Sequence, residues 1–328
     1  MVVKWNGVMS EERDLIGGTA QGSIFGIWSY LTSSNENAAC VPEDCNYKFV
    51  DDLTVLEKVN LLVIGLASYN AHASVPSHIP DHNQFIPAEH LESQKYLNQI
   101  QEWSENNKMI LNHQKTQLMI FNFTTKHQFT TNLKLQEHHL EVVKKAKLLG
   151  VIITDDLKWD ENTAYLVKKG YSRLELLRKV AEITTSVSEM KLIYIQYIRS
   201  ILEQSCVVWH SSLTEENSSD LERVQKCAIK IILRKPYASY EEALKCLNLE
   251  SLEERRQKLC EKFALDCVRN EKMKTIFPKK DRKHHMKLRN SETFKVNFAK
   301  TKRLQQSSVV NMQQQLNSVM RTRKRNFG

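Results

Sequence analysis

The pattern of this 328-residue chain changes near residue 155, and that change constrains its fold more than any other feature. From residue 1 to about residue 154, short apolar runs alternate with Gly, Asn and Asp turns, which is typical of strands and short helices. From about residue 160 to 270, apolar residues recur at three- and four-residue steps, which predicts helices. We therefore expect an α+β half followed by an all-α half.

Three apolar stripes in the second half predict helix faces that pack as a small bundle. They are Ala164, Val167, Tyr171, Leu174 and Leu177; Met190, Ile193, Tyr197 and Ile201; and Leu221, Val224, Ala228 and Ile231. Beyond Phe277-Pro278 the apolar density falls and basic residues accumulate. We expect residues 279–328 to be a loosely ordered basic tail, with one helix near 303–320.

The net charge of +9 is unevenly distributed along the chain. Residues 251–328 hold 21 Lys and Arg against 7 Asp and Glu, and the rest of the chain is mildly acidic. A polycation of this density favours polyanions, with nucleic acid first and an acidic membrane surface as the competitor. A basic tail that is simply solvated is the alternative.

Cysteine usage and hydropathy indicate an intracellular protein of the nucleus or cytoplasm, with no membrane partner. The seven cysteines form an odd set without a C-x-x-C pair, which favours reduced thiols. The longest apolar run, residues 61–67, is too short to span a bilayer, and the first ten residues lack the apolar core of a signal peptide. Cys40 and Cys45 with nearby histidines fit no usual zinc spacing.

Two adjacent acids, Asp51 and Asp52, separate two apolar strands and predict a β-hairpin with carboxylates at its tip. At about 4 Å and an effective dielectric near 20, two such charges repel by about 4 kcal/mol, so a cation is favoured beside them. Oxygen ligands of this kind suit Mg²⁺. The alternative is a solvated Asp-Asp turn. A second acid pair, Asp155-Asp156, is interpreted as a helix cap.

Three further stretches are weak signals when taken one at a time. A glycine-rich loop contains Gly18, Gln21, Gly22 and Ser23 and lets a backbone approach a ligand closely, although an ordinary turn explains it too. Lys115 lies between an amphipathic helix and a predicted strand at 116–123, where a solvated charge is the alternative. Leu149, Gly150 and Val151 lie in a predicted strand at 148–153, which is otherwise simply core sheet.

In this order, the four stretches resemble the palm of a reverse transcriptase of the non-LTR (LINE-type, jockey-like) retrotransposon family. The resemblance implies that Phe49-Val50-Asp51-Asp52 is the metal-binding box and that Gly18, Gln21, Gly22 and Ser23 contact template and nucleotide. It implies that Lys115 protonates the leaving pyrophosphate and that Leu149, Gly150 and Val151 grip the primer end. Residues 198–210 and 221–226 resemble the region that follows the palm in this family.

The family's activity is RNA-directed DNA polymerisation, in which two Mg²⁺ ions promote transfer of a dNTP to a primer. The implied partners are an RNA template, a DNA primer or hybrid duplex, and dNTP. The family's third metal-binding aspartate and its fingers precede the glycine loop, and we expect this chain to begin inside the polymerase domain. On that expectation the isolated chain does not polymerise.

The resulting domain prediction is a partial palm over 1–158, a helical thumb-like and connection region over 159–278, and the basic tail over 279–328. Two other functions stay open: a non-catalytic nucleic-acid-binding protein made of the helices and the basic tail, and an expressed remnant without function. For the helical half, a packing domain without any ligand is the alternative to a thumb.

Overall fold

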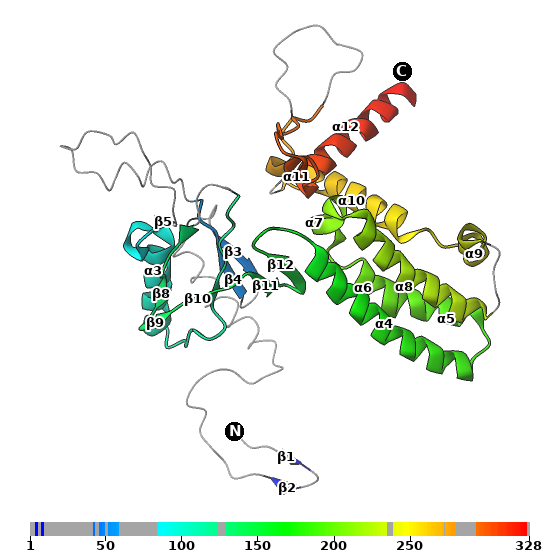
Figure 1. Ribbon diagram of the computed structural model, residues 1–328, viewed down its shortest axis with the longest axis horizontal. Helices are drawn as coiled ribbons and strands as arrows, with labels where there is room; N and C mark the ends of the chain where they lie inside the picture. The colour runs from blue at the N-terminus through cyan, green and yellow to red at the C-terminus, as the bar shows by residue number, and fades with distance from the viewer. Residues whose placement is uncertain are drawn as a thin grey trace. The chain divides into compact units, whose positions relative to one another are not determined.

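The computed structural model describes residues 4–5, 8–9, 42, 46–49, 52–58, 84–123, 129–234, 239–271, 273–279 and 293–326. Over these residues the protein mixes helices with small sheets, as the α+β prediction expects (Figure 1). The chain divides into two compact units, Met1–Lys144 and Lys145–Gly328. The sequence predicts the boundary at 158, because it assigns the strands near residue 150 to the first domain.

The strands of unit 1 form separate two-stranded ladders. The antiparallel pairs are β1 (Lys4–Trp5) with β2 (Val8–Met9), β3 (Asn46–Phe49) with β4 (Asp52–Val55), and β8 (Lys134–Leu135) with β9 (His138–His139). The parallel pairs are β5 (Gln84–Phe85) with β7 (Phe129–Thr130), and β6 (Gln117–Leu118) with β10 (Glu141–Val142). No sheet in the described residues has a third strand, so the antiparallel palm sheet that the resemblance implies is not confirmed there.

Unit 1 is organised around α3 (Glu92–Asn106), which follows the 3₁₀ turn η1 (Ala88–His90). Its small core contains Ile86, Leu91 and Leu133. Because Leu91 provides no side-chain cap, Glu57 caps the helix instead, accepting from the backbone N–H of Glu92 at 3.2 Å and of Ser93 at 2.9 Å. This cap ties the end of β4 to α3.

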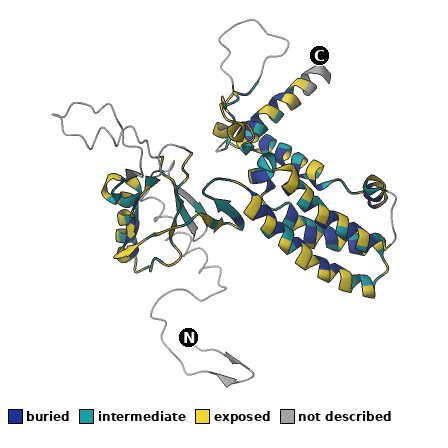
Figure 2. Cartoon of the chain, in the orientation of Figure 1, coloured by how far each residue is buried: buried dark blue, intermediate teal, exposed yellow. Residues whose placement is uncertain are grey.

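Unit 2 begins with the hairpin of β11 (Lys145–Leu148) and β12 (Val151–Thr154), which packs on the helices that follow. These are α4 (Asp160–Ile183), α5 (Val187–Ile193), the π-helical segment η2 (Tyr194–Arg199), α6 (Ser200–Leu202), α7 (Cys206–Trp209), the 3₁₀ turn η3 (His210–Ser212), α8 (Glu215–Leu233), α9 (Tyr240–Leu247) and α10 (Leu252–Arg269). Figure 2 shows their buried residues in dark blue along α4 and α8. Side-chain caps at Ser186, Thr214, Ser239 and Ser251 begin α5, α8, α9 and α10.

Two buried polar clusters cross this helical core. In the first, the Tyr194 hydroxyl donates to Oε1 of Gln225, whose Nε2 donates to the Tyr240 hydroxyl at 2.7 Å. In the second, Arg256 is fully buried and donates to Oγ of Ser218 at 3.1 Å and to Nδ1 of His210 at 3.4 Å. Both clusters join α8 to its neighbouring segments through buried hydrogen bonds, although Nη1 of Arg256 has no hydrogen-bond partner among the described residues.

The predicted loosely ordered tail is ordered over 293–326, which corrects that expectation. Its helices are α11 (Lys302–Gln305) and α12 (Ser308–Asn326), close to the helix expected near 303–320, and the 3₁₀ turn η4 (Lys274–Ile276) precedes them. Phe294, Met312 and Leu316 are buried with Cys260 and Phe277 in a second core, where α12 packs on α10. The segment is held because these few apolar residues share one packed cluster.

No helix in the described ranges is long and apolar enough to cross a membrane. The cysteines within those ranges, at positions 206, 227, 246, 260 and 267, are all free thiols, and three of them are buried.

Candidate nucleic-acid interface

The β3–β4 hairpin carries the predicted metal-binding acids. Its register pairs Phe49 with Asp52, so the strands predicted on either side of the acid pair form. Asp51 lies outside the described residues, as do Gly18, Gln21, Gly22 and Ser23 of the glycine loop. Of Asp52 the structure gives only its place at the start of β4. The described part of the chain contains no cluster of three or more His, Cys, Asp or Glu that suits a metal ion, and the Mg²⁺ site stays a prediction.

Lys115 lies in an exposed turn just before β6. Asn112 holds this turn, because its carbonyl accepts from the N–H of Lys115 at 3.2 Å and of Thr116 at 3.1 Å. The predicted strand at 116–123 is shorter than expected, since only Gln117–Leu118 pairs with another strand. Among the described residues, no hydrogen bond or ion pair joins the Lys115 side chain to the β3–β4 hairpin.

Leu149 and Gly150 are the turn of the β11–β12 hairpin and not part of a strand, which corrects the prediction of a strand at 148–153. Both have positive φ, +48° and +87°, as the central residues of a tight hairpin turn require. A side chain at position 150 would collide with Gln204. The turn therefore lies against the segment between α6 and α7, and its backbone conformation needs glycine there.

Val151 anchors this hairpin in the core of unit 2, where it is buried with Trp159 and Leu166. The N–H of Ile152 also donates to Oδ1 of Asn162 on α4 at 3.1 Å. Leu149 remains 48% exposed at the tip. The hairpin is thus held firmly on α4 while its tip is open to a ligand.

Asp156 does not cap α4, contrary to the interpretation of the second acid pair. The helix begins after Trp159 without a side-chain cap. Oδ1 of Asp156 instead accepts from the Thr154 hydroxyl at 2.8 Å and from the N–H of Lys158 at 3.1 Å. The acid braces the turn that leads from β12 to α4.

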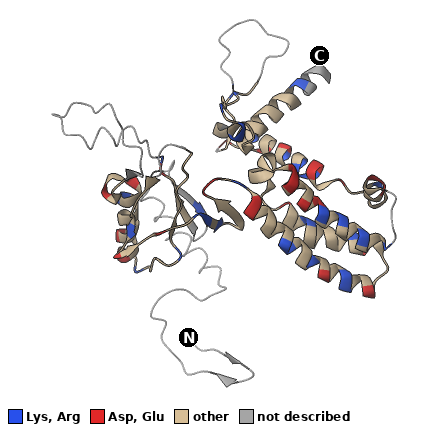
Figure 3. Ribbon diagram, in the orientation of Figure 1, with Lys and Arg blue, Asp and Glu red and all other residues tan. Residues whose placement is uncertain are grey.

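Basic and aromatic side chains line up beside the hairpin, on β11, α4 and η2. The Lys147 ammonium donates to the Tyr165 hydroxyl at 2.9 Å, and Lys169 lies over the same ring, 5.0 Å from its centre. One turn farther along α4, the guanidinium of Arg173 lies 5.7 Å from the ring centre of Tyr197. We call these five residues the hairpin–α4 face. Figure 3 shows the Lys and Arg residues of the hairpin and α4 in blue.

The electrostatics of this face favour anions. Hydrogen bonds from Lys147 and Lys169 lower the pKa of the Tyr165 phenol below its usual value. Cations are the groups that contact phosphates in nucleic acids. Of the two rings, Tyr165 packs partly against the core and Tyr197 is 49% exposed, so Tyr197 provides the surface for a sugar or base. Sequence reasoning missed this face, although the four-residue spacing of Tyr165, Lys169 and Arg173 on a predicted helix was a visible signal.

Comparisons with protein-family models, curated proteins and solved structures give no match for this chain. The reverse-transcriptase resemblance therefore remains a hypothesis based on the sequence motifs.

Proposed function

We propose that this chain is a reverse transcriptase of the non-LTR retrotransposon kind, or a part of one, and that it binds an RNA template with its DNA primer. The observation that carries the proposal is the hairpin–α4 face, in which three cations and two tyrosines lie beside a rigid β-hairpin. The order of the sequence motifs along the chain supports the family. The register of β3 and β4, with Phe49 opposite Asp52, is compatible with an acid-tipped hairpin.

In this proposal the two units have different tasks. Lys147, Lys169 and Arg173 of unit 2 contact backbone phosphates of the hybrid, and Leu149 packs against the primer end. In unit 1, Asp51 and Asp52 would hold Mg²⁺, and the ion would supply positive charge to the nucleotide triphosphate in the intact polymerase domain. Lys115 is the proton donor to the leaving pyrophosphate, and Gly18, Gln21, Gly22 and Ser23 contact template and nucleotide.

Filter binding of a labelled RNA–DNA hybrid to the full chain tests phosphate contact by the hairpin–α4 face. Each phosphate contact contributes about −0.9 to the slope of log K against log salt for a duplex. We therefore expect the triple variant, with alanine at Lys147, Lys169 and Arg173, to have a slope of log K against log salt that is less negative by about 2 to 3. Lys245→Ala, at an exposed lysine of α9, is the matched control. An unchanged slope in the triple variant would refute the role of this face.

The same binding assay with and without Mg²⁺ distinguishes the polymerase hypothesis from the hypothesis of a non-catalytic nucleic-acid-binding protein. A polymerase-type site predicts that Mg²⁺ strengthens binding and that Asp51→Asn with Asp52→Asn removes this gain. Equal binding by the wild type and this double variant at every Mg²⁺ concentration contradicts the hypothesis of a polymerase-type metal site. Failure of the wild type to bind at physiological salt favours the functionless remnant.

A non-catalytic protein that binds through its basic tail is the second candidate, since the helix α12 ends in the basic run 321–325. Deleting residues 279–328 is not a clean test of it, because Phe294, Met312 and Leu316 belong to the second core. Replacing Arg321, Arg323, Lys324 and Arg325 by glutamine removes the charge and keeps that core. The second candidate is favoured if this variant no longer binds the hybrid and if the Asp51 and Asp52 substitutions leave binding unchanged.

A further inference from the structure

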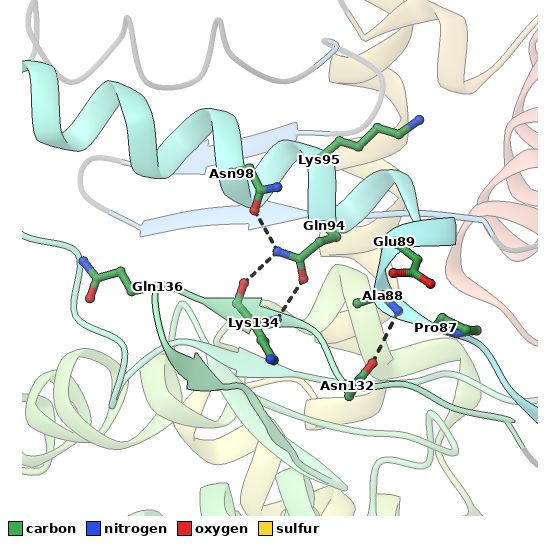
Figure 4. A pocket seen from close by; sticks show the side chains of 9 residues that line it. All are labelled: Pro87, Ala88, Glu89, Gln94, Lys95, Asn98, Asn132, Lys134 and Gln136. Atoms are coloured by element: carbon green, nitrogen blue, oxygen red, sulfur yellow. Dashed lines mark hydrogen bonds between the residues drawn. The ribbon is translucent and has the colours of Figure 1, made fainter.

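A polar groove of about 630 Å³ lies on unit 1, between α3 and the segments near residues 87–89 and 132–136 (Figure 4). This volume is within the range of about 300–1,000 Å³ found for small-molecule sites. The side chains that concern us are Glu89, Gln94, Asn98, Asn132, Lys134 and Gln136. We call the feature the amide groove, because four of these six side chains are carboxamides.

Internal hydrogen bonds hold the walls of the amide groove. Gln94 pairs with the backbone of Lys134 in both directions: its Oε1 accepts from the N–H at 2.8 Å, and its Nε2 donates to the carbonyl at 2.9 Å. The same Nε2 donates to Oδ1 of Asn98 at 2.8 Å. Across the groove, Oδ1 of Asn132 accepts from the N–H of Ala88 at 3.3 Å. The groove is therefore built before any ligand arrives.

The polar groups of the amide groove that make no internal hydrogen bond are mainly hydrogen-bond donors. Asn98 and Asn132 both use their oxygens internally, so their amide N–H groups stay available. The Gln136 side chain and the Lys134 ammonium have no partner in the described part of the chain, and neither does the Glu89 carboxylate. Lys95 contributes less, because it is bound to Glu92 at 2.7 Å and points away from the Gln94–Lys134 pair in Figure 4.

This donor set fits the edges of nucleobases. Asn and Gln side chains recognise adenine, a lysine recognises guanine or a phosphate, and a carboxylate accepts from the amino group of cytosine. Pro87 and Ala88 add apolar surface to the lining, and a ligand without hydrogen-bonding groups would leave its amides and charges unpaired. Short side chains on an open surface do not reach base edges inside an RNA duplex, whereas unpaired bases present them directly.

We propose that the amide groove binds a single-stranded segment of nucleic acid and reads its base edges. The inference rests on the proposed nucleic-acid function and adds a sequence-reading site to it, separate from the hairpin–α4 face. The groove contains no aromatic ring for base stacking. Hydrogen bonding therefore gives it sequence preference, whereas the cations of the hairpin–α4 face give affinity that is independent of sequence.

The test is a binding selection in which the full chain is offered a pool of random single-stranded RNA and, in a parallel arm, of single-stranded DNA. The wild type is expected to enrich a short sequence motif. Asn98→Ala with Asn132→Ala should bind the pool about as well and lose about tenfold or more in preference for that motif, the usual range for a lost base contact. Gln114→Ala, at an exposed amide outside the groove, is the control and should keep the preference.

The double variant Lys147→Ala with Lys169→Ala tests the proposed function without changing the amide groove. That variant should weaken binding to all sequences equally and leave the enriched motif unchanged. A wild type that binds without any preference, or a preference that survives the double asparagine variant, overturns the groove inference and leaves the proposed function standing. A wild type that binds no nucleic acid overturns both.

Cross-linking gives a second readout that does not depend on the variants folding well. RNA that carries the enriched motif with 4-thiouridine is expected to cross-link to peptides that contain residues 87–98 or 132–136. Cross-links confined to unit 2 contradict the inference. So does a result in which an added peptide, and not RNA, shields the residues of the groove from reaction.

Discussion

Gly170 offers a sharp test of how closely the helices of unit 2 pack. It lies in α4 at the contact with α8 and α6, where an added Cβ would be 2.9 Å from Cγ1 of Val224 and 3.2 Å from Cδ2 of Leu202. Both neighbours are fully buried. Because the valine side chain is branched at Cβ and stiff, it does not rotate away easily.

Two opposing effects set the result of Gly170→Ala. Alanine in a helix interior gains about 1 kcal/mol over glycine. A methyl group forced into a well-packed core costs about 1–3 kcal/mol. With a mid-range cost we expect the free energy of unfolding to fall by about 1 kcal/mol. In a Val224→Ala background both methyl groups of the valine are absent, and Cδ2 of Leu202, at the end of a more flexible side chain, is the close neighbour that remains. The same substitution should then raise the free energy of unfolding by up to about 1 kcal/mol.

Urea denaturation of the wild type, both single variants and the double variant measures this reversal as a double-mutant cycle. The exposed position Ser172, also in α4, is the control. Ser172→Ala should raise stability by only about half a kcal/mol in either background. An effect of Gly170→Ala with the same sign in both backgrounds would refute the close approach of α4 to α8.

Three further predictions concern buried or capping polar groups. Tyr194→Phe leaves Oε1 of Gln225 without its buried donor and should cost about 1–3 kcal/mol in urea denaturation. Burial and the neighbouring Arg256 lower the pKa of His210 below 6.5. The unfolded chain therefore takes up this proton first, and stability falls as the pH drops below 6.5; a His210→Gln variant should show a flatter dependence. Glu57→Ala removes the cap of α3, which should cost about 1 kcal/mol and speed hydrogen exchange at the first turn of the helix.

Helix faces were predictable from the sequence where the helix is regular. The stripe of α8 is confirmed at Leu221, Val224 and Ala228, which are fully buried. The stripe expected at Met190, Ile193, Tyr197 and Ile201 is confirmed at Met190, and Ile193 and Ile201 pack on the core while partly exposed. It is wrong at Tyr197, which is 49% exposed. The buried residues there are Met190, Tyr194, Ile198 and Leu202, in steps of four. The π-helical segment η2 lies within this stretch, and its wider turn shifts the face by one residue relative to an α-helix.

The first stripe is wrong only in part: Ala164 and Tyr171 are exposed, whereas Val167 packs on the core. Leu174 and Leu177 are buried as predicted, whereas Tyr171 is 39% exposed and Gly170 is buried in its place. A prediction from hydropathy counts tyrosine among the apolar residues of a helix face and does not count glycine. At this contact the absence of a side chain is what allows the two helices to approach, and no periodicity of apolar residues signals that.

Of the candidate site, local strand pairing was predictable from the sequence, and the contacts around it were not. The apolar residues on either side of Asp51 and Asp52 indicated a hairpin, and the β3–β4 ladder forms. The hairpin–α4 face depends on Lys147 meeting Tyr165 across a turn, and the amide groove depends on Gln94 pairing with Lys134 forty residues away. Contacts of this kind arise from tertiary packing, which one sequence without its relatives does not report.

A buried amide of α12 holds the tail in addition to the apolar residues of the second core. Asn317 is buried on α12, where its Oδ1 accepts from the N–H groups of Thr293 and Phe294 at 2.9 Å each. Its Nδ2 donates to the carbonyl of Phe294 at 3.1 Å, so Asn317→Ala leaves three backbone groups without their partner. At about 1–3 kcal/mol for each buried unsatisfied group, the substitution should release residues 293–297 from α12.

Limited proteolysis and hydrogen exchange over residues 293–297 measure this release, and Gln314→Ala, at an exposed position of the same helix, is the control. Faster cleavage in Asn317→Ala alone is the expected result. Equal protection in both variants means that the burial of Phe294, together with the hydrogen bond from the N–H of Asn297 to Oε1 of Gln313 at 2.9 Å, is sufficient to hold the segment. In that case the pairing of Asn317 is not needed to order the tail.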